Sequence, residues 1–352
     1  MKHRKQQNEW KLGEMTIDEC TSYKYLGDII SNDGKNTKNI ETRKEKINAS
    51  TVTINTIAES DILCRIETAV LLKLHEKVSI PGLIANCESW NLKKAEIQEL
   101  ERIEIQAVKY LLDLPIHIPT PALLFTLGIP FTESRIDQSQ LLYLYKILSR
   151  EQTHWTKRIL EKLEYKNIGW YKNITEKLNK YGLETDFQSI KNTTLIEWKR
   201  KVTREIERKN TERLKQELYK TDQGAPTLKT KTASIAKHLS EQSYCRKPQH
   251  DIVNCTKYET KTLMIARYGM LECGNNFKGT MNALCDSCKV LDDENHRLNY
   301  CEKYNDINLV SADEIIDFDL VYSRDINELR KILPRINDVW DTRNAHGTMA
   351  KL

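Results

Sequence analysis

Glycine and proline are both scarce in this chain of 352 residues, with 12 and 8 copies, whereas lysine, glutamate, leucine and isoleucine are abundant. Folds made of many short strands need glycine and proline in their turns, so the composition argues against a β-sandwich or a barrel. Lysine, glutamate and leucine are good helix formers. We therefore expect a mainly α-helical fold, with room for two or three domains.

Long apolar segments are absent as well. No apolar run approaches the roughly 18 residues that a membrane-spanning helix needs, and the start MKHRKQQNEWK is not followed by the apolar stretch of a signal peptide. The nine cysteines are an odd number. We therefore expect no membrane partner and a reducing intracellular compartment, nuclear or cytoplasmic, in which cysteines bind metals more often than they form disulfides.

The motifs of common catalytic sites are also missing. The chain has no Walker P-loop and no H-E-x-x-H, G-x-S-x-G or G-x-G-x-x-G pattern. Two-metal polymerase or nuclease chemistry needs carboxylates gathered at one point. The one pair of adjacent aspartates, Asp292 and Asp293, lies in a predicted loop with no strand on either side. We interpret this pair as solvated loop charge and expect no catalytic residues.

Hydrophobic periodicity divides the chain into five stretches. Residues 1–35 read as extended structure, so we expect a small β-hairpin that looks like the edge of an incomplete sheet. Helical spacing predicts a bundle over residues 36–150 and a basic helical linker over residues 151–244. Residues 245–310 hold a metal-binding pattern, and residues 311–352 form a helical tail that we expect to pack against it.

Prolines mark the expected helix ends. Pro81 is expected to end the second helix of the bundle, and Pro115 the third. The segment from Pro115 to Phe131 contains four prolines and is expected to enclose one short helix. In the tail, Pro334 is expected to separate a helix from a short final segment.

The metal-binding pattern consists of Cys285, Cys288, His296 and Cys301, at the spacing C-x2-C-x7-H-x4-C. Structural Zn²⁺ sites use four tetrahedral Cys or His ligands, and a two-residue gap lets one tight turn aim two sulfurs at a single ion. Four protein ligands leave no position for a catalytic water, so we expect a structural zinc ion. The alternative is that these are ordinary thiols beside a solvated histidine.

Basic residues cluster locally, although the total of 55 Lys and Arg against 50 Asp and Glu leaves a net charge of only +5. In the predicted helix around Trp198 and Val202, one face is apolar and the others are basic. The candidate phosphate-contacting residues there are Lys199, Arg200, Arg204 and Arg208. The alternative is a solvated face on which acidic neighbours pair with these cations.

Several stretches, taken in order, resemble the reverse transcriptases of non-LTR (LINE-type) retrotransposons, downstream of their catalytic palm. YKYLGDIIS (Tyr23 to Ser31) resembles the strand motif that forms the primer grip. IPGLIANCESW (Ile80 to Trp90) resembles the thumb pattern P-x-L-L-Y-G-x-E-x-W. LDLPIHIPTPALLFTLGIP (Leu112 to Pro130) resembles the segment that follows. ARYGMLECGNNFKG and the metal pattern resemble the C-terminal zinc knuckle of the family and its lead-in.

The chain departs from the family in two ways. It keeps Pro81, Glu88 and Trp90 of the thumb pattern but has Ala85-Asn86 where the family commonly shows Tyr-Gly. The paired-aspartate catalytic motif of the family should lie before residue 1, and an endonuclease is likewise absent. We therefore expect the C-terminal part of such an enzyme, without polymerase activity of its own.

The resemblance implies a protein that copies its RNA at a nicked chromosomal target, with thumb and knuckle gripping template, primer or target DNA. The implied partners are RNA, DNA or both, and an upstream reverse transcriptase palm. Tyr25, Leu26 and Gly27 are the implied contacts of the primer-grip-like strand. Beside the metal pattern, Tyr300 and Tyr304 are candidates for base stacking. Lys289 and Arg297 are candidates for phosphate contacts there.

Two other functions fit the same sequence. The chain could complete a polymerase in trans by pairing with a palm made separately. Alternatively, it could be a helical protein-interaction module with a structural zinc site, because zinc modules often contact other proteins. Binding to oligonucleotides at low salt distinguishes the last possibility from the others.

Overall fold

The N-terminal strands form two separate antiparallel hairpins. In the computed structural model, β1 (Trp10–Leu12) pairs with β2 (Met15–Ile17), and β3 (Ser22–Tyr25) pairs with β4 (Asp28–Ser31). The described residues are 10–17, 19–58, 66–220, 250–268, 271, 273, 284–303, 318–323 and 325–346. Leu26 and Gly27 form the turn of the second hairpin with φ of 47° and 92°. Two positive φ values suit the twist of a hairpin, and glycine adopts them without strain.

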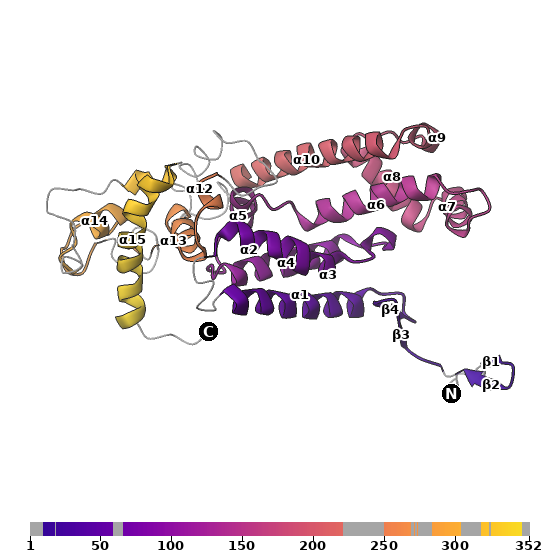
Figure 1. Cartoon of the computed structure of the whole chain (residues 1–352), viewed down its shortest axis with the longest axis horizontal. Helices are drawn as coiled ribbons and strands as arrows, with labels where there is room; N and C mark the ends of the chain where they lie inside the picture. Colours follow the sequence, from indigo (N-terminus) through magenta and orange to yellow (C-terminus); the bar gives the residue numbers. More distant parts are fainter. Residues whose placement is uncertain are drawn as a thin grey trace, which may run out of the picture.

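The rest of the described chain is helical, as the composition predicts (Figure 1). The first group of helices is α1 (Thr37–Ala58), α2 (Thr68–Leu74), the π-helical turn η1 (His75–Ser79), α3 (Ile80–Ile84), the 3-10 turn η2 (Cys87–Ser89) and α4 (Lys94–Leu111). They are followed by α5 (Thr120–Leu127), α6 (Thr132–Leu148), α7 (Trp155–Lys166), α8 (Gly169–Tyr181), α9 (Phe187–Lys191) and α10 (Leu195–Lys220). The last are α12 (His250–Val253), α13 (Lys257–Arg267), α14 (Glu294–Asn299), the 3-10 helix η6 (Phe318–Tyr322) and α15 (Ile326–His346).

The helix ends predicted from the prolines are partly right and partly wrong. α4 ends before Pro115, and α5 is the single short helix expected between Pro115 and Phe131. Pro81, however, does not end its helix, which continues through η1 into α3. The missing N–H of Pro81 falls next to the π-helical turn, where the regular hydrogen-bond ladder is already interrupted. Pro334 likewise lies inside α15.

Apolar side chains from both ends of the chain share the largest core. It joins α2, α4 and α5 to α13, α15 and two cysteines of the metal-binding pattern, Cys285 and Cys301. Hydrogen bonds support this packing: the Tyr268 hydroxyl donates to the carbonyl of Ala122 at 2.9 Å. The predicted contact of the tail with the metal-binding region is confirmed, since Arg335 on α15 donates to the Leu298 carbonyl of α14 at 3.2 Å.

Two further cores lie beside the first. One is built between α1, α3, α4 and α6, and the other between α6 and α10 with α7, α8 and α9 around them. α6 therefore contributes to both, and it joins the predicted bundle to the predicted basic linker. Within the described part of the chain, no helix combines the length and apolar composition needed to cross a bilayer.

His75 is a buried titratable group of the helical body with a strongly shifted pKa. It is buried in η1, and neither ring nitrogen has a hydrogen-bond partner among the described residues. Burial and the positive charge of Arg135 lower the pKa of His75 to about 4. Since an unfolded histidine has a pKa near 6.5, the unfolded chain takes up this proton first as the pH falls.

We expect His75→Leu to remove a large part of the acid sensitivity of the fold. Neutral His75 makes its full contribution to the free energy of unfolding above about pH 6.5, and this contribution is lost towards pH 4. The loss amounts to about 3 kcal/mol, because the folded and unfolded pKa values differ by about 2.5 units. Urea unfolding at pH 7.5 and pH 4.5 measures this loss in the native chain and the variant. His117→Leu, at an exposed position, is the control. An equal loss in all three proteins would contradict the assignment.

Candidate metal centre and adjoining surfaces

A tight turn brings the first two cysteines of the metal-binding pattern together. An isolated bridge pairs Leu284 with Leu291, and the Cys285 N–H donates to the Val290 carbonyl at 2.7 Å. Lys289 closes the turn with φ of 58° and donates its N–H to the Cys285 carbonyl at 2.9 Å. The backbone therefore folds Cys285 and Cys288 onto the same side of the turn.

The short helix α14 supplies the other two residues. Its N-terminus is capped by Asp293, whose carboxylate accepts a hydrogen bond of 2.7 Å from the His296 N–H. His296 lies within this helix, and Cys301 follows its end. The cap therefore fixes the start of α14 and with it the position of the His296 imidazole relative to the Cys301 sulfur.

The four residues converge as the spacing predicts. One ligand atom from each of Cys285, Cys288, His296 and Cys301 lies within 4.8 Å of all the others, and the group could hold a metal ion. The Cys301 sulfur is 3.7 Å from the sulfur of Cys285 and 4.0 Å from that of Cys288. The side chains are buried, apart from half-buried Cys288. The Glu302 N–H donates to the Cys288 sulfur at 3.3 Å.

The electrostatics of the cluster favour a bound cation. Burial raises the pKa of the Cys301 thiol, and the adjacent Cys285 sulfur raises it further. For Cys285, burial also acts to raise the pKa, but hydrogen bonding, first from the backbone N–H of Cys288, lowers it overall. Three thiols this close cannot all ionise without a compensating positive charge. Nε2 of His296 is buried without a hydrogen-bond partner among the described residues, which leaves its lone pair available for coordination.

The interpretation of Asp292 and Asp293 as solvated loop charge is wrong. Asp292 is buried and forms a bidentate ion pair with Arg297, five residues later in the chain. Asp293 is the cap of α14. The spacing of the acidic and basic residues in the loop did not reveal these roles, because they arise only when the loop closes around the cluster. Arg297, expected to contact phosphate, is held in this ion pair.

The other residues expected to contact nucleic acid differ in their location and mostly lie on the surface. Lys289 and Tyr300 are exposed, and Tyr304 lies outside the described residues. Tyr25 and Leu26 are exposed at the turn of the β3–β4 hairpin with Gly27. This hairpin and α14 lie towards opposite ends of the long axis (Figure 1). The structure therefore distributes the predicted contact residues over separate surfaces.

The β3–β4 hairpin is anchored by a buried arginine. Arg43 of α1 forms an ion pair with Asp28 of β4 and donates to the Gly82 carbonyl at 3.2 Å. Asn86 donates to the other oxygen of Asp28 at 3.0 Å. The guanidinium of Arg43 also lies 5.2 Å from the ring centre of Trp90. These contacts join the Tyr23–Ser31 stretch to the Ile80–Trp90 stretch, and a hollow of about 520 Å³ lies between them.

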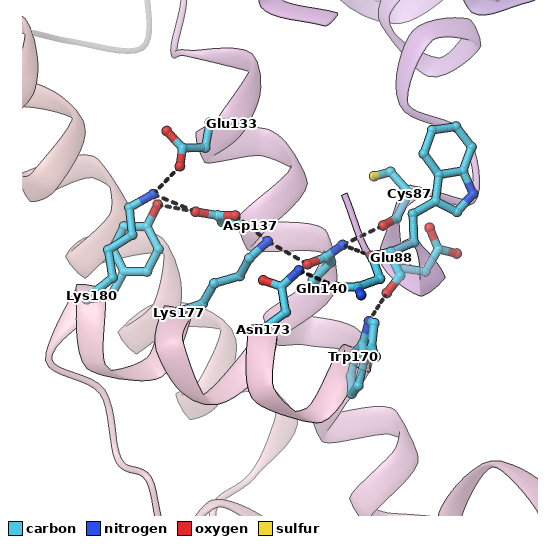
Figure 2. A network of polar contacts seen from close by, with 12 residues as sticks. Cys87, Glu88, Glu133, Asp137, Gln140, Trp170, Asn173, Lys177 and Lys180 are labelled. Atoms are coloured by element: carbon cyan, nitrogen blue, oxygen red, sulfur yellow. Dashed lines mark hydrogen bonds and ion pairs between the residues drawn. The ribbon is translucent and has the colours of Figure 1, made fainter. Parts of the chain in front are cut away.

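A polar network that sequence reasoning missed supports the second of these stretches (Figure 2). The Gln140 side chain of α6 donates to the carbonyls of Cys87 and Trp90 at 2.7 and 2.9 Å and accepts from Lys177 at 2.6 Å. The indole of Trp170 donates to the Glu88 carbonyl at 2.9 Å. Gln140 directly follows a polar stretch and precedes the apolar run that begins at Leu141, so its sequence position gave no signal of a buried role.

Asp137 extends the network along α6 and α8. It pairs with Lys177 at 2.6 Å and with Lys180 at 2.9 Å, and it accepts from the Tyr181 hydroxyl at 2.7 Å. Burial acts to raise the pKa of Asp137, but the positive charges of Lys177 and Lys180 outweigh it and hold the pKa below its ordinary value. The turn that carries Glu88 and Trp90 therefore rests on a polar network that reaches the buried carboxylate of Asp137 through Gln140 and Lys177.

Ion pairs occupy much of the basic face of α10. Arg204 pairs with Glu205 at 3.1 Å, and Arg208 pairs with Glu205 at 2.9 Å and with Glu212 at 2.5 Å. This is the pairing expected of a solvated helix face. Lys199 and Arg200, one to two turns earlier, are exposed and form no salt bridge among the described residues, although the charge of Arg200 acts on Glu197 one turn before it. The unpaired positive charge of α10 is therefore concentrated at its beginning.

Relatives do not identify these surfaces. No model of a known protein family, no curated protein and no solved structure matches the chain. A function must therefore be argued from the geometry of the cluster, the anchored hairpin and the sequence resemblance.

We expect Asp28→Ala to destabilise the protein by about 3 kcal/mol, the effect of leaving one partner of a buried ion pair without compensation. The Arg43 side chain is only 2% exposed, so water cannot take the place of the carboxylate. The matched control is Asp33→Ala, which removes an exposed carboxylate paired with Lys35 and should cost less than about 0.5 kcal/mol. Urea unfolding measures both, and similar values for the two variants would refute the role of Asp28.

Proposed function

We propose that Cys285, Cys288, His296 and Cys301 hold one structural Zn²⁺ ion. Zinc–sulfur bonds of about 2.3 Å in a tetrahedron separate the sulfurs by about 3.8 Å. The two sulfur separations of 3.7 and 4.0 Å agree with this geometry. Zinc also favours the donor set of three thiolates and one imidazole, and four protein ligands give it a structural role.

We further propose that the chain is the nucleic-acid-binding C-terminal part of a retrotransposon reverse transcriptase of the non-LTR type. The observation that carries this proposal is that the stretches with the resemblance contact one another. Asp28 and Asn86 join the primer-grip-like hairpin to the thumb-like turn. Tyr268 joins the knuckle lead-in to the segment around Ala122. An accidental set of short matches would have no reason to meet in space.

The departure from the thumb pattern also fits this proposal. Asn86 has φ of 61°, in the left-handed region. Glycine adopts this conformation freely, and asparagine is among the few other residues that visit it routinely. Asn86 stands where the family commonly has glycine, so the backbone shape is compatible with that of the family despite the substitution. Its side chain gains a hydrogen bond to Asp28 that glycine could not make.

In this function the chain grips RNA or DNA and depends on a separate palm for chemistry. Tyr25, Leu26 and Gly27 present an exposed turn beside the hollow between hairpin and thumb. Lys199 and Arg200 offer exposed positive charge at the start of α10, outside any salt bridge among the described residues. Tyr300 and Lys289 are exposed beside the metal cluster, where stacking and phosphate contacts are available.

A second candidate is that the chain completes a polymerase in trans. The observation that favours it is the apolar face of the β1–β2 hairpin, where Trp10 is opposite Ile17 and Leu12 is opposite Met15. All four side chains are more than half exposed. A two-stranded hairpin with an uncovered apolar face is marginal by itself and gains stability by packing against another sheet or helix.

We expect about one zinc ion per chain in protein purified under reducing conditions, measured by elemental analysis. Cys288→Ser should reduce the zinc content severalfold. Cys20→Ser, at an exposed free cysteine, should leave it unchanged. A chelator should also lower the thermal unfolding midpoint, because Cys285 and Cys301 belong to the largest core. Absence of zinc from the native chain, or equal zinc in both variants, would refute the site.

We expect single-stranded RNA or DNA to bind with affinity that falls steeply with salt, at about 0.7 in log K per log salt for each phosphate contacted. The double variant Lys199→Gln/Arg200→Gln should reduce this slope of log K against log salt. Arg204→Gln with Arg208→Gln removes the same charge from paired residues and should change it less. Fluorescence anisotropy of a labelled oligonucleotide measures both slopes. A flat salt dependence of the native chain would contradict the proposed function.

A further inference from the structure

One face of α7 is uncovered and combines aromatic with basic side chains. Successive residues of an α-helix advance by about 100° around its axis. On this basis six residues of α7 fall within about 120° of its circumference, namely Trp155, Arg158, Ile159, Lys162, Tyr165 and Lys166. All six are exposed. We call this set the α7 face.

The rest of α7 holds the helix in place. Leu160, on the opposite side, is buried in the core shared with α6, α8 and α10. The acidic residues of the helix lie outside the α7 face: Glu164 is on the back of the helix and Glu161 on its flank, where it accepts a hydrogen bond from Gln152. The α7 face therefore contains three cations and no carboxylate.

Its aromatic rings are unusually open to solvent. Trp155 is 73% exposed and Tyr165 is 90% exposed. The Arg158 guanidinium lies 5.2 Å from the Trp155 ring centre and covers one side of the indole, which leaves the other side open. Both rings are therefore accessible to a planar ligand.

The charges of the α7 face are available to a ligand. Among the described residues, no salt bridge includes Lys162 or Lys166. On α10, by contrast, carboxylates neutralise Arg204 and Arg208. The difference arises because α10 interleaves acidic residues with basic ones on its exposed side, whereas α7 keeps its acidic residues away from its basic face.

We infer that the α7 face binds single-stranded nucleic acid, with bases stacked on Trp155 and Tyr165 and phosphates held by Arg158, Lys162 and Lys166. Aromatic platforms alternating with cations are the general means by which proteins bind single strands without reading sequence. Ten residues separate the two rings, or about 15 Å along the helix, so they receive different bases of one strand. This inference rests on the proposed function and adds a surface that the resemblance does not indicate.

The composition of the α7 face favours a nucleic acid over an anionic membrane. A helix that lies in a bilayer surface needs a broad apolar side to insert among the lipids. Here the helix already uses Leu160 to bind its own protein, and Ile159 is the one aliphatic residue of the exposed set. The helix α7 lies towards the same end of the long axis as the β3–β4 hairpin (Figure 1).

The test uses the full zinc-loaded chain and a labelled uridine 12-mer in fluorescence anisotropy. The double variant Trp155→Ala/Tyr165→Ala should weaken binding about 25-fold or more, since each stacked base contributes at least about fivefold. Lys162→Gln with Lys166→Gln should reduce the slope of log K against log salt by up to about 1.4. The matched controls are Tyr110→Ala, an exposed tyrosine on α4, and Arg204→Gln with Lys209→Gln, both already paired. Unchanged urea unfolding confirms that the variants are folded.

The outcomes separate this inference from the function on which it rests. If the native chain binds no oligonucleotide at low salt, the proposed function fails and the inference fails with it. If the native chain binds and the α7 variants bind equally well, the inference alone is overturned. Vesicles containing phosphatidylserine are the third arm: binding to them that is lost in Trp155→Ala with Tyr165→Ala, while binding to RNA is kept, would assign the α7 face to a membrane instead.

Discussion

Burial of apolar side chains from both ends of the chain in one core is the interaction on which the rest of the structure depends. Helices α2, α4 and α5 supply one side of this core, and α13, α15 and the metal-binding cysteines supply the other. The cluster is therefore packed into the helical body and is not a separate module joined to it by a linker. A metal ion held by this cluster would therefore also stabilise helices far from it in the sequence, because they share one core with Cys285 and Cys301.

Buried polar groups determine how the neighbouring elements are arranged on this body. Arg43 cannot remain inside the protein without a carboxylate, so Asp28 must bring the second hairpin to it. Gln140 similarly holds the turn at Cys87 and Trp90, and Lys177 satisfies the oxygen of Gln140 in turn (Figure 2). Each of these groups would cost free energy if left unpaired, and together they specify one arrangement of the hairpin, the turn and α6.

The charged helices illustrate how surface function depends on partners as well as on composition. Both α7 and α10 are rich in lysine and arginine. Arg204 and Arg208 of α10 are paired with glutamates, whereas the cations of the α7 face share it with exposed aromatic rings. A phosphate ligand gains most from charges that are not already paired, so the two helices differ in what they offer such a ligand although both are basic.

The sequence by itself determined the helical class, the position of the short helix between Pro115 and Phe131, and the four residues of the metal cluster. These features follow from spacing over a few turns of chain, where covalent geometry limits what neighbouring residues can do. Tertiary structure alone decided that Asp292 is buried against Arg297, that Gln140 supports the Cys87 turn, and that Pro81 lies within a continuous helix. Contacts between residues that are distant in the sequence form only when the chain folds. The partner of a buried charge therefore depends on how the helices pack, and neighbouring residues in the sequence do not reveal it.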